Sequence, residues 1–178
     1  MKVWARQFNI YLMLAATLGL LCGCSSLTNK PHGPTAALRV HIEASHDSLA
    51  LDTGQTVSVL RADPVLVTIA KDPILTEANI IAAKLIEAPG GFALEVRFDE
   101  TGTWVLEQYT AANPGSHLVI FGQWGEKLDN GRWLAAPIIT HRIANGVLAF
   151  TPDMSHSEAE QLVTGLDNVA TFNKNRSK

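Results

Sequence analysis

Apolar residues recur along the chain at two spacings, which predict two kinds of element. Leu38, Val40 and Ile42 alternate with polar neighbours, the period-two pattern of a strand with one buried face. The alternation returns after a turn signal at residues 89–91, which predicts a hairpin leading into a strand at 92–98. The second half of residues 80–86 is also predicted as strand, although the composition of this segment fits a helix as well. Turn signals lie at residues 129–131 and 145–146. Further strands are predicted at residues 57–60, 65–70, 118–121, 133–135 and 147–150.

Two segments have helical spacing instead. Asp99 occupies an N-cap position before a helix that ends at residues 113–115, and Ser155 with Glu158 has the spacing of a capping box. The expected apolar faces of these helices are Val105, Leu106, Tyr109 and Ala112 in the first, and Ala159, Leu162, Val163 and Leu166 in the second. The pattern indicates an α+β fold, a mostly antiparallel sheet of hairpins with two amphipathic helices packed on one face.

The N-terminal residues have the order of a signal peptide. Two basic residues precede an acid-free, largely apolar run at residues 8–21, and small Gly23 then precedes a cysteine. A run of about 14 residues is shorter than the roughly 20 that a membrane-spanning helix needs. The similarity to bacterial lipoproteins implies cleavage between Gly23 and Cys24 and acylation of Cys24, which anchors the chain to the membrane. Ser25 replaces the aspartate that retains lipoproteins at the inner membrane, which favours the outer membrane.

These signals divide the chain into four parts: a signal peptide at 1–23, a lipidated flexible tether at 24–37, a single α+β domain at 38–172 and a polar tail at 173–178. Both cysteines, Cys22 and Cys24, precede the domain, so no disulfide is expected within it. The formal net charge is −3, and it becomes −5 without the leader, which holds two basic residues and no acid. That sign argues against nucleic acid and against a polybasic membrane contact.

Several short motifs in sequence order resemble the head subdomain in the first periplasmic domain of SecD/SecDF. A strand followed by a helix start at residues 94–102 leads to a Thr-x-x-Asn-x-Gly corner formed by Thr110, Asn113 and Gly115. The other matching segments are the entry at residues 73–76, the apolar strand at 117–121, the Ala-Pro-Ile step at 135–139, Phe150-Thr151 and the acidic helix start at 158–162. The similarity covers roughly residues 65–168.

This resemblance implies a protein-contacting module. The sequence has no counterpart of the further periplasmic base and membrane helices of SecD, so the motor function is not expected here. We therefore expect a non-enzymatic envelope module that binds an envelope protein or peptide. The alternatives are an enzyme or small-ligand binder whose site is assembled only in three dimensions, and a purely structural lipoprotein. A deep pocket lined by Asp, His and Arg would favour a small ligand, whereas an apolar groove beside a sheet edge would favour a peptide.

The polar residues form no recognisable catalytic or metal-binding pattern in the sequence. The six histidines lack ligand spacing, so no metal site or cofactor is expected. Ser116-His117 lacks the Gly-x-Ser-x-Gly elbow, and no phosphate-binding glycine loop is present. Asp99 and Glu100 fit a helix start better than an acid–base pair.

The remaining candidates are aromatic. Phe121, Trp124 and Trp133 lie on either side of a predicted hairpin, and Trp104 lies off the apolar stripe of its helix. Tryptophans are most often partly buried in a core. If two of them share an exposed face with Phe121, that face is the expected partner-binding surface, because aromatic anchors dominate interface energetics.

Overall fold

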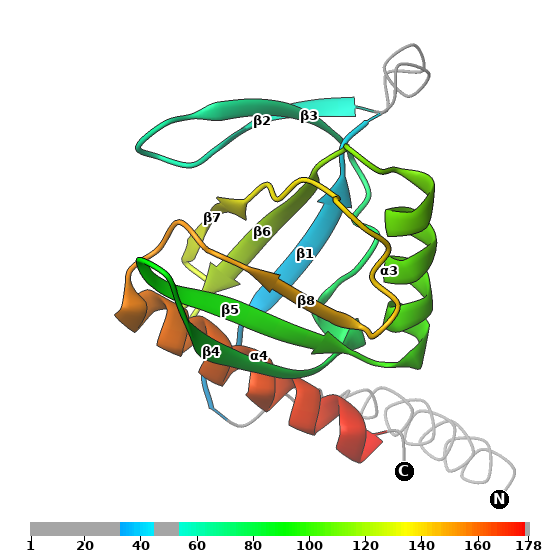
Figure 1. Ribbon diagram of the computed structural model, residues 1–178. Coiled ribbons are helices and arrows are strands. Elements are labelled where there is room, and N and C mark those ends of the chain that lie inside the picture. The colour runs from blue at the N-terminus through cyan, green and yellow to red at the C-terminus, as the bar shows by residue number, and fades with distance from the viewer. Residues whose placement is uncertain (1–32, 45–53, 177–178) are drawn as a thin grey trace, which may run out of the picture. The chain divides into compact units, whose positions relative to one another are not determined.

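A computed structural model describes residues 33–44 and 54–176 (Figure 1). The predicted signal peptide, the cleavage site at Gly23 and Cys24, and His46 lie outside the described residues. The described elements are, in chain order, β1 (Ala37–Ile42), β2 (Gly54–Val59), β3 (Val65–Ala70), the 3₁₀ helix η1 (Glu77–Asn79), β4 (Ile80–Ala88), β5 (Gly91–Phe98), α3 (Glu100–Ala112), β6 (Leu118–Trp124), β7 (Asn130–Ala135), β8 (Val147–Phe150) and α4 (His156–Arg176). The strands form three antiparallel sheets, so the predicted α+β class is confirmed.

The first sheet has the order β1-β6-β7. Its central strand β6 is buried on both faces at Leu118, Val119 and Ile120, as the continuous apolar run predicted. In β1 the prediction of a polar outer face is wrong at His41, which is only 6% exposed. The reason is that β2 and β3 cover that face of the sheet, which leaves Arg39 as the exposed residue of β1.

The second sheet has the order β4-β5-β8 (Figure 1). The predicted hairpin between β4 and β5 is confirmed, with Gly90 at φ 84° and Gly91 at φ 154° in the turn. Residues 80–88 are strand throughout, including the first half whose composition fits a helix, because pairing with β5 begins at Ile80 opposite Phe98. Tertiary pairing therefore overrides local helix propensity here.

A two-stranded ribbon, β2 and β3, lies over the outer face of the first sheet. Val57, Val59, Val67 and Ile69 form a small apolar cluster with Val119 of β6, separate from the main core. At the base of the ribbon the N–H of Ala44 donates to the carbonyl of Thr68 at 2.8 Å. At the tip the side chain of Arg61 donates to both carboxylate oxygens of Asp153, which precedes α4.

The long helix α4 packs along edge strand β4 and against β6 and β1, on the side of the first sheet opposite the ribbon (Figure 1). The capping box is confirmed, since the backbone N–H of Ser155 donates to Glu158 at 2.8 Å and the N–H of Glu158 donates to the hydroxyl of Ser155 at 3.3 Å. The helix continues to Arg176, into the segment predicted as a polar tail. Residues 34–36, predicted as part of the tether, lie against this helix.

Helix α3 begins at the predicted N-cap, where the Asp99 side chain accepts the N–H of Gly102 at 2.7 Å. Its predicted buried face is correct at Leu106 and at the partly buried Val105, and wrong at Tyr109, which is 39% exposed, and at Ala112, which is also exposed. Thr110 faces inward instead, because its hydroxyl donates to the carbonyl of Leu106 at 2.7 Å and accepts the N–H of Ile143 at 2.9 Å. A buried hydroxyl is tolerated when both of its roles are satisfied in this way.

The turn between β6 and β7 lies earlier than the sequence predicted. Gly125 and Leu128 have positive φ angles of 103° and 55°, and the N–H of Leu128 donates to the carbonyl of Gly125. Asn130 and Gly131, predicted as turn residues, already belong to β7. A main core between the first two sheets and the helices joins all these elements; its most buried members include Leu38, Val40, Leu94, Val96, Leu106, Leu118, Ile120, Leu148, Leu162 and Leu166.

Candidate functional site

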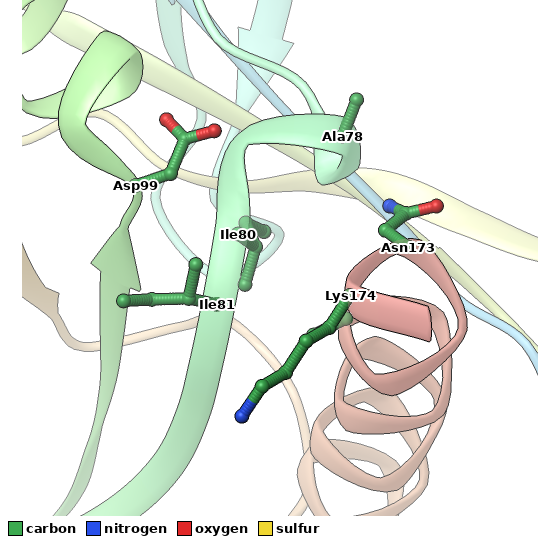
Figure 2. A pocket seen from close by; sticks show the side chains of 7 residues that line it. Ala78, Ile80, Ile81, Asp99, Asn173 and Lys174 are labelled. Carbon is green, nitrogen blue, oxygen red and sulfur yellow. The ribbon is translucent and has the colours of Figure 1, made fainter. Parts of the chain in front are cut away.

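A cavity of about 560 Å³ opens between the start of β4 and the C-terminal half of α4 (Figure 2). Its lining is mostly aliphatic, with polar groups at the rim: Ala78, Ile80, Ile81, Asp99, Ala170, Asn173 and Lys174. Three elements therefore meet here, namely the turn of η1 that leads into β4, the start of α3 and the end of α4.

A β-bulge at the start of β4 shapes this cavity. Ile80 pairs with Phe98 and Ala82 pairs with Arg97, so Ile81 is an extra residue without a partner in β5. Ile80 is 2% exposed and Ile81 is 54% exposed, yet both line the cavity (Figure 2). A regular strand would place these neighbours on opposite faces of the sheet, so the bulge brings both isoleucines to one opening.

The turn before the bulge is held by a closed set of hydrogen bonds. The hydroxyl of Thr76 accepts the N–H of Ala78 at 3.3 Å, and the backbone N–H of Thr76 donates to the side chain of Asn79 at 3.2 Å. The N–H of Asp99 in turn donates to the carbonyl of Asn79 at 2.8 Å. The capping box of η1 and the N-cap of α3 therefore fix this rim of the cavity in one geometry.

A second, smaller cavity of about 330 Å³ lies at the other end of β4, near the start of α4. Phe92 and His156 meet there edge to face, with ring centroids 5.2 Å apart. Its lining is Leu85, Ile86, Glu87, Gly91, Phe92 and His156. We call the two cavities together with β4 between them the β4–α4 groove.

Between the two cavities α4 holds the edge of β4 directly. The backbone N–H of Ala83 donates to the carboxylate of Asp167 at 3.0 Å. β4 is an edge strand of its sheet, and its partner strand is on the other side. The groove suits an extended polypeptide whose apolar side chains enter the two cavities, although α4 occupies the edge of β4 between them.

The residues predicted to bind a partner lie on two different faces. Phe121 and Trp133 are paired across β6 and β7, and their rings lie 5.0 Å apart. Trp133 also meets His41 edge to face at 5.3 Å, under the ribbon. Both aromatic side chains are partly buried, so they form a shared patch beside the ribbon.

Trp124 does not join this patch. It is 1% exposed, it belongs to the main core, and the guanidinium of Arg132 lies 4.9 Å from its ring centre. Because side chains alternate along a strand, Trp124 and Phe121 of β6 point to opposite faces. The prediction of one surface shared by all three aromatic residues is therefore wrong at Trp124, which is buried in the main core.

Among the described residues, four acidic or imidazole groups have lowered pKa values, all of them in structural contacts: His41, Glu43, Asp153 and Glu158. Burial lowers the pKa of His41, although its Nδ1–H donates to the carbonyl of Ala70 at 2.9 Å and so favours the charged form. Partial burial opposes ionisation of Glu43, but hydrogen bonds from the ring and backbone N–H of His117 outweigh it and lower its pKa. The hydrogen bond from the Arg61 side chain lowers the pKa of Asp153.

Within the described ranges, no group of three or more His, Cys, Asp or Glu side chains is placed to hold a metal ion. His41, His117, His141 and His156 each lie in a different part of the fold, and His117 and His156 face Glu43 and Glu160 respectively. Over the same ranges no helix is both long enough and apolar enough to cross a bilayer.

Sequence reasoning missed the groove itself. In the sequence Ile81 is one residue of an apolar run, and no local signal marks the bulge that places it beside Ile80 at the cavity. From the sequence, Asp167 is expected to be an ordinary polar residue on the outer face of a helix. Its hydrogen-bond partner, the backbone N–H of Ala83, is 84 residues away in the sequence and gives no local signal. The one available signal was the composition of residues 80–86, which fits a helix as well as a strand.

Solved structures of SecDF have a similar fold. A structure described as the membrane component SecDF that enhances protein export superposes with a TM-score of 0.51 at 21% identity, over 83% of this chain and 70% of that one. The SecDF-like fold predicted from the motifs is therefore confirmed. A crystal structure of SecDF in a super-membrane-facing form gives a TM-score of 0.51 at 20% identity, over 76% of this chain and 19% of that one. No protein-family model and no curated protein sequence matches the chain.

Proposed function

We propose that this protein is a bacterial envelope lipoprotein, anchored through an acylated Cys24, whose SecDF-like domain at residues 38–172 binds extended polypeptide segments without catalysing a reaction. The signal for cleavage between Gly23 and Cys24 supports the anchor, and Ser25 favours the outer membrane. The domain then occupies the periplasm, held by its tether. Protein export by SecDF, the membrane component with this fold, supports a polypeptide as the ligand.

The observation that carries the binding role is the β4–α4 groove. Its two cavities lie at the two ends of edge strand β4. Their apolar lining includes Ile80, Ile81, Leu85, Ile86 and Phe92. Successive side chains of an extended peptide alternate in direction, so every second residue of a bound segment can enter such a row of apolar sites. Affinity for unfolded rather than folded protein follows, because folded proteins bury these side chains.

Binding can be tested with a permanently unfolded probe, a reduced and alkylated protein carrying a fluorophore. Its anisotropy should rise on titration with the mature domain, and the same protein in its native form should give no rise. Ile81→Ser should weaken binding roughly fivefold, since the side chain is already half buried and the remaining contact contributes about 1 kcal/mol. Leu66→Ser is the matched control, because Leu66 is a 73% exposed aliphatic residue on the ribbon. Equal affinity for folded and unfolded probe would contradict the binding role.

The anchor is tested separately. Replacement of Cys24 by serine should block acylation, shift the mass of the membrane-extracted protein and move it from the membrane to the soluble fraction. Density-gradient separation of inner and outer membranes then locates the acylated form. An unchanged mass and fractionation of the Cys24→Ser variant would contradict lipidation while leaving peptide binding untouched.

A further inference from the structure

The first described residues follow the surface of α4 towards its C-terminal end. Ala36 packs against Gly165, where an added Cβ would lie 2.6 Å from the Cβ of Ala36. The side-chain amide of Asn168 donates to the carbonyl of Pro34 at 2.9 Å, and Gly33 also lies beside Asn168. Going back from Ala36 to Gly33, the chain therefore advances along α4 in the direction of its last turns.

Chain length limits how far the anchor can lie from this point. Nine residue steps separate Cys24 from Gly33, and an extended chain spans at most about 30 Å over nine residues. Arg176 lies eight residues beyond Asn168, a distance of about 12 Å along the helix. A lipid attached at Cys24 thus keeps both ends of α4 within reach of the bilayer surface, because His156 lies twelve residues before Asn168, about 18 Å along the helix, and the charge at each end determines which one faces the bilayer.

Charge is distributed unevenly along this helix. The last turn carries Lys174 and Arg176, both exposed, and the guanidinium of Arg176 lies 5.7 Å from the ring centre of Phe172. Two acidic residues, Glu158 and Glu160, lie in the first turns at the opposite end, Asp167 lies between the two ends, and Asp99 lines the same cavity as Lys174. An anionic membrane surface attracts the basic end and repels the acidic one.

We infer that the C-terminal end of α4 faces the membrane next to the anchor and that Lys174 and Arg176 contact anionic phospholipid headgroups. This inference rests on the proposed acylation of Cys24. The net negative charge argued against a polybasic membrane contact for the domain as a whole. The contact inferred here involves only the two basic residues at the end of α4, and the negative charge of the rest of the domain keeps that part away from the anionic surface. The ribbon tip, where Arg61 is bonded to Asp153 just before the start of α4, lies at the other end of the helix and then points away from the bilayer.

The orientation can be measured with single fluorescent labels on the acylated full chain. The mature sequence has no cysteine other than Cys24, so a cysteine introduced at Asn175 or at Ala62 in the ribbon tip is labelled selectively. The proteins are reconstituted in vesicles containing phosphatidylglycerol, and a headgroup-attached quencher is added to the lipid. Fluorescence at position 175 should be quenched at least twofold more than at position 62. Neutral phosphatidylcholine vesicles, high salt or the double variant K174Q/R176Q should each reduce that difference.

The possible failures are distinct. A chain that does not float with the vesicles lacks the acyl anchor, which overturns both the proposed lipidation and this orientation. A chain that floats but shows equal quenching at the two positions, or stronger quenching at position 62, overturns the orientation and leaves the anchor intact. Thermal unfolding of K174Q/R176Q at the parent temperature establishes that the variant remains folded, as expected for two exposed positions.

Discussion

The backbone N–H of Ala83 on β4 donates a hydrogen bond of 3.0 Å to the carboxylate of Asp167 on α4. An edge strand presents unpaired N–H groups that can recruit another strand, and here the helix satisfies one of them in the middle of the strand. The same bond fixes α4 alongside β4 and so sets the separation of the two walls of the β4–α4 groove.

Asp167→Ala should therefore lower the free energy of unfolding by about 1–2 kcal/mol, because it leaves the N–H of Ala83 without an acceptor at a position that is 6% exposed. Asp167→Asn is the matched control, since its amide oxygen still accepts, and it should lose less. Urea unfolding measures both. Equal stability of the alanine variant and the parent protein would show that the hydrogen bond contributes nothing.

Gly165→Ala should also destabilise the domain, by about 1–2 kcal/mol net. Alanine is intrinsically about 1 kcal/mol better than glycine within a helix. The new Cβ would nevertheless lie 2.7 Å from the backbone nitrogen of Ala36 and 2.8 Å from the carbonyl carbon of Thr35, and backbone atoms cannot move aside easily. Thr164→Ala, on the exposed face of the same turn, should be neutral or slightly stabilising. A more stable Gly165→Ala variant would mean that residues 35–36 do not pack on α4.

His41 should make the domain less stable in mild acid. Burial lowers its pKa in the folded state below the usual 6.5, so the unfolded chain takes up the proton first as the pH falls. The contribution of neutral His41 is thus complete above about pH 6.5 and is lost as the pH drops through the lower folded-state pKa.

The free energy of unfolding, measured from pH 7.5 to 5, should consequently decrease, and His41→Gln should flatten this dependence while it keeps a donor for the carbonyl of Ala70. Gln108→Ala, at an exposed position without a titratable group, should leave the slope unchanged. A parent slope identical to that of His41→Gln would contradict the assigned role of burial.

Tryptophan fluorescence should separate the exposed from the buried rings. Trp104 is 62% exposed and Trp124 is 1% exposed. In the mature chain Trp104→Phe should therefore shift the emission to the blue and reduce acrylamide quenching, whereas Trp124→Phe should shift it to the red and increase the quenched fraction. Identical quenching of the two variants would be incompatible with this placement.

The sequence predicted the helices and most strands because local physics determines them. Period-two alternation identified β5, the capping residues Asp99 and Ser155 fixed both helix starts, and a continuous apolar run identified central strand β6. The prediction was wrong where a distant segment changed the local environment. His41 is buried because the ribbon covers it, and Thr110 faces inward because Ile143 donates to its hydroxyl.

The groove was beyond sequence reasoning for the same reason. The position of Ile81 depends on a bulge in the pairing of β4 with β5. The register of a strand pair depends on both strands together, so the sequence of β4 alone does not determine it. The aromatic prediction was partly informative: Phe121 and Trp133 do share a face. It could not place Trp124, because doing so requires knowing which face of β6 the main core occupies.

The ribbon packs through its own valines and Ile69 on one face of the first sheet, and the main core lies on the other. A unit with a separate cluster can open by itself at a free energy below that of global unfolding. It can also be exchanged for a different hairpin without redesigning the rest of the protein, as long as the replacement covers Val119 and His41. The ribbon is thus a natural place to graft reporter tags or foreign epitopes.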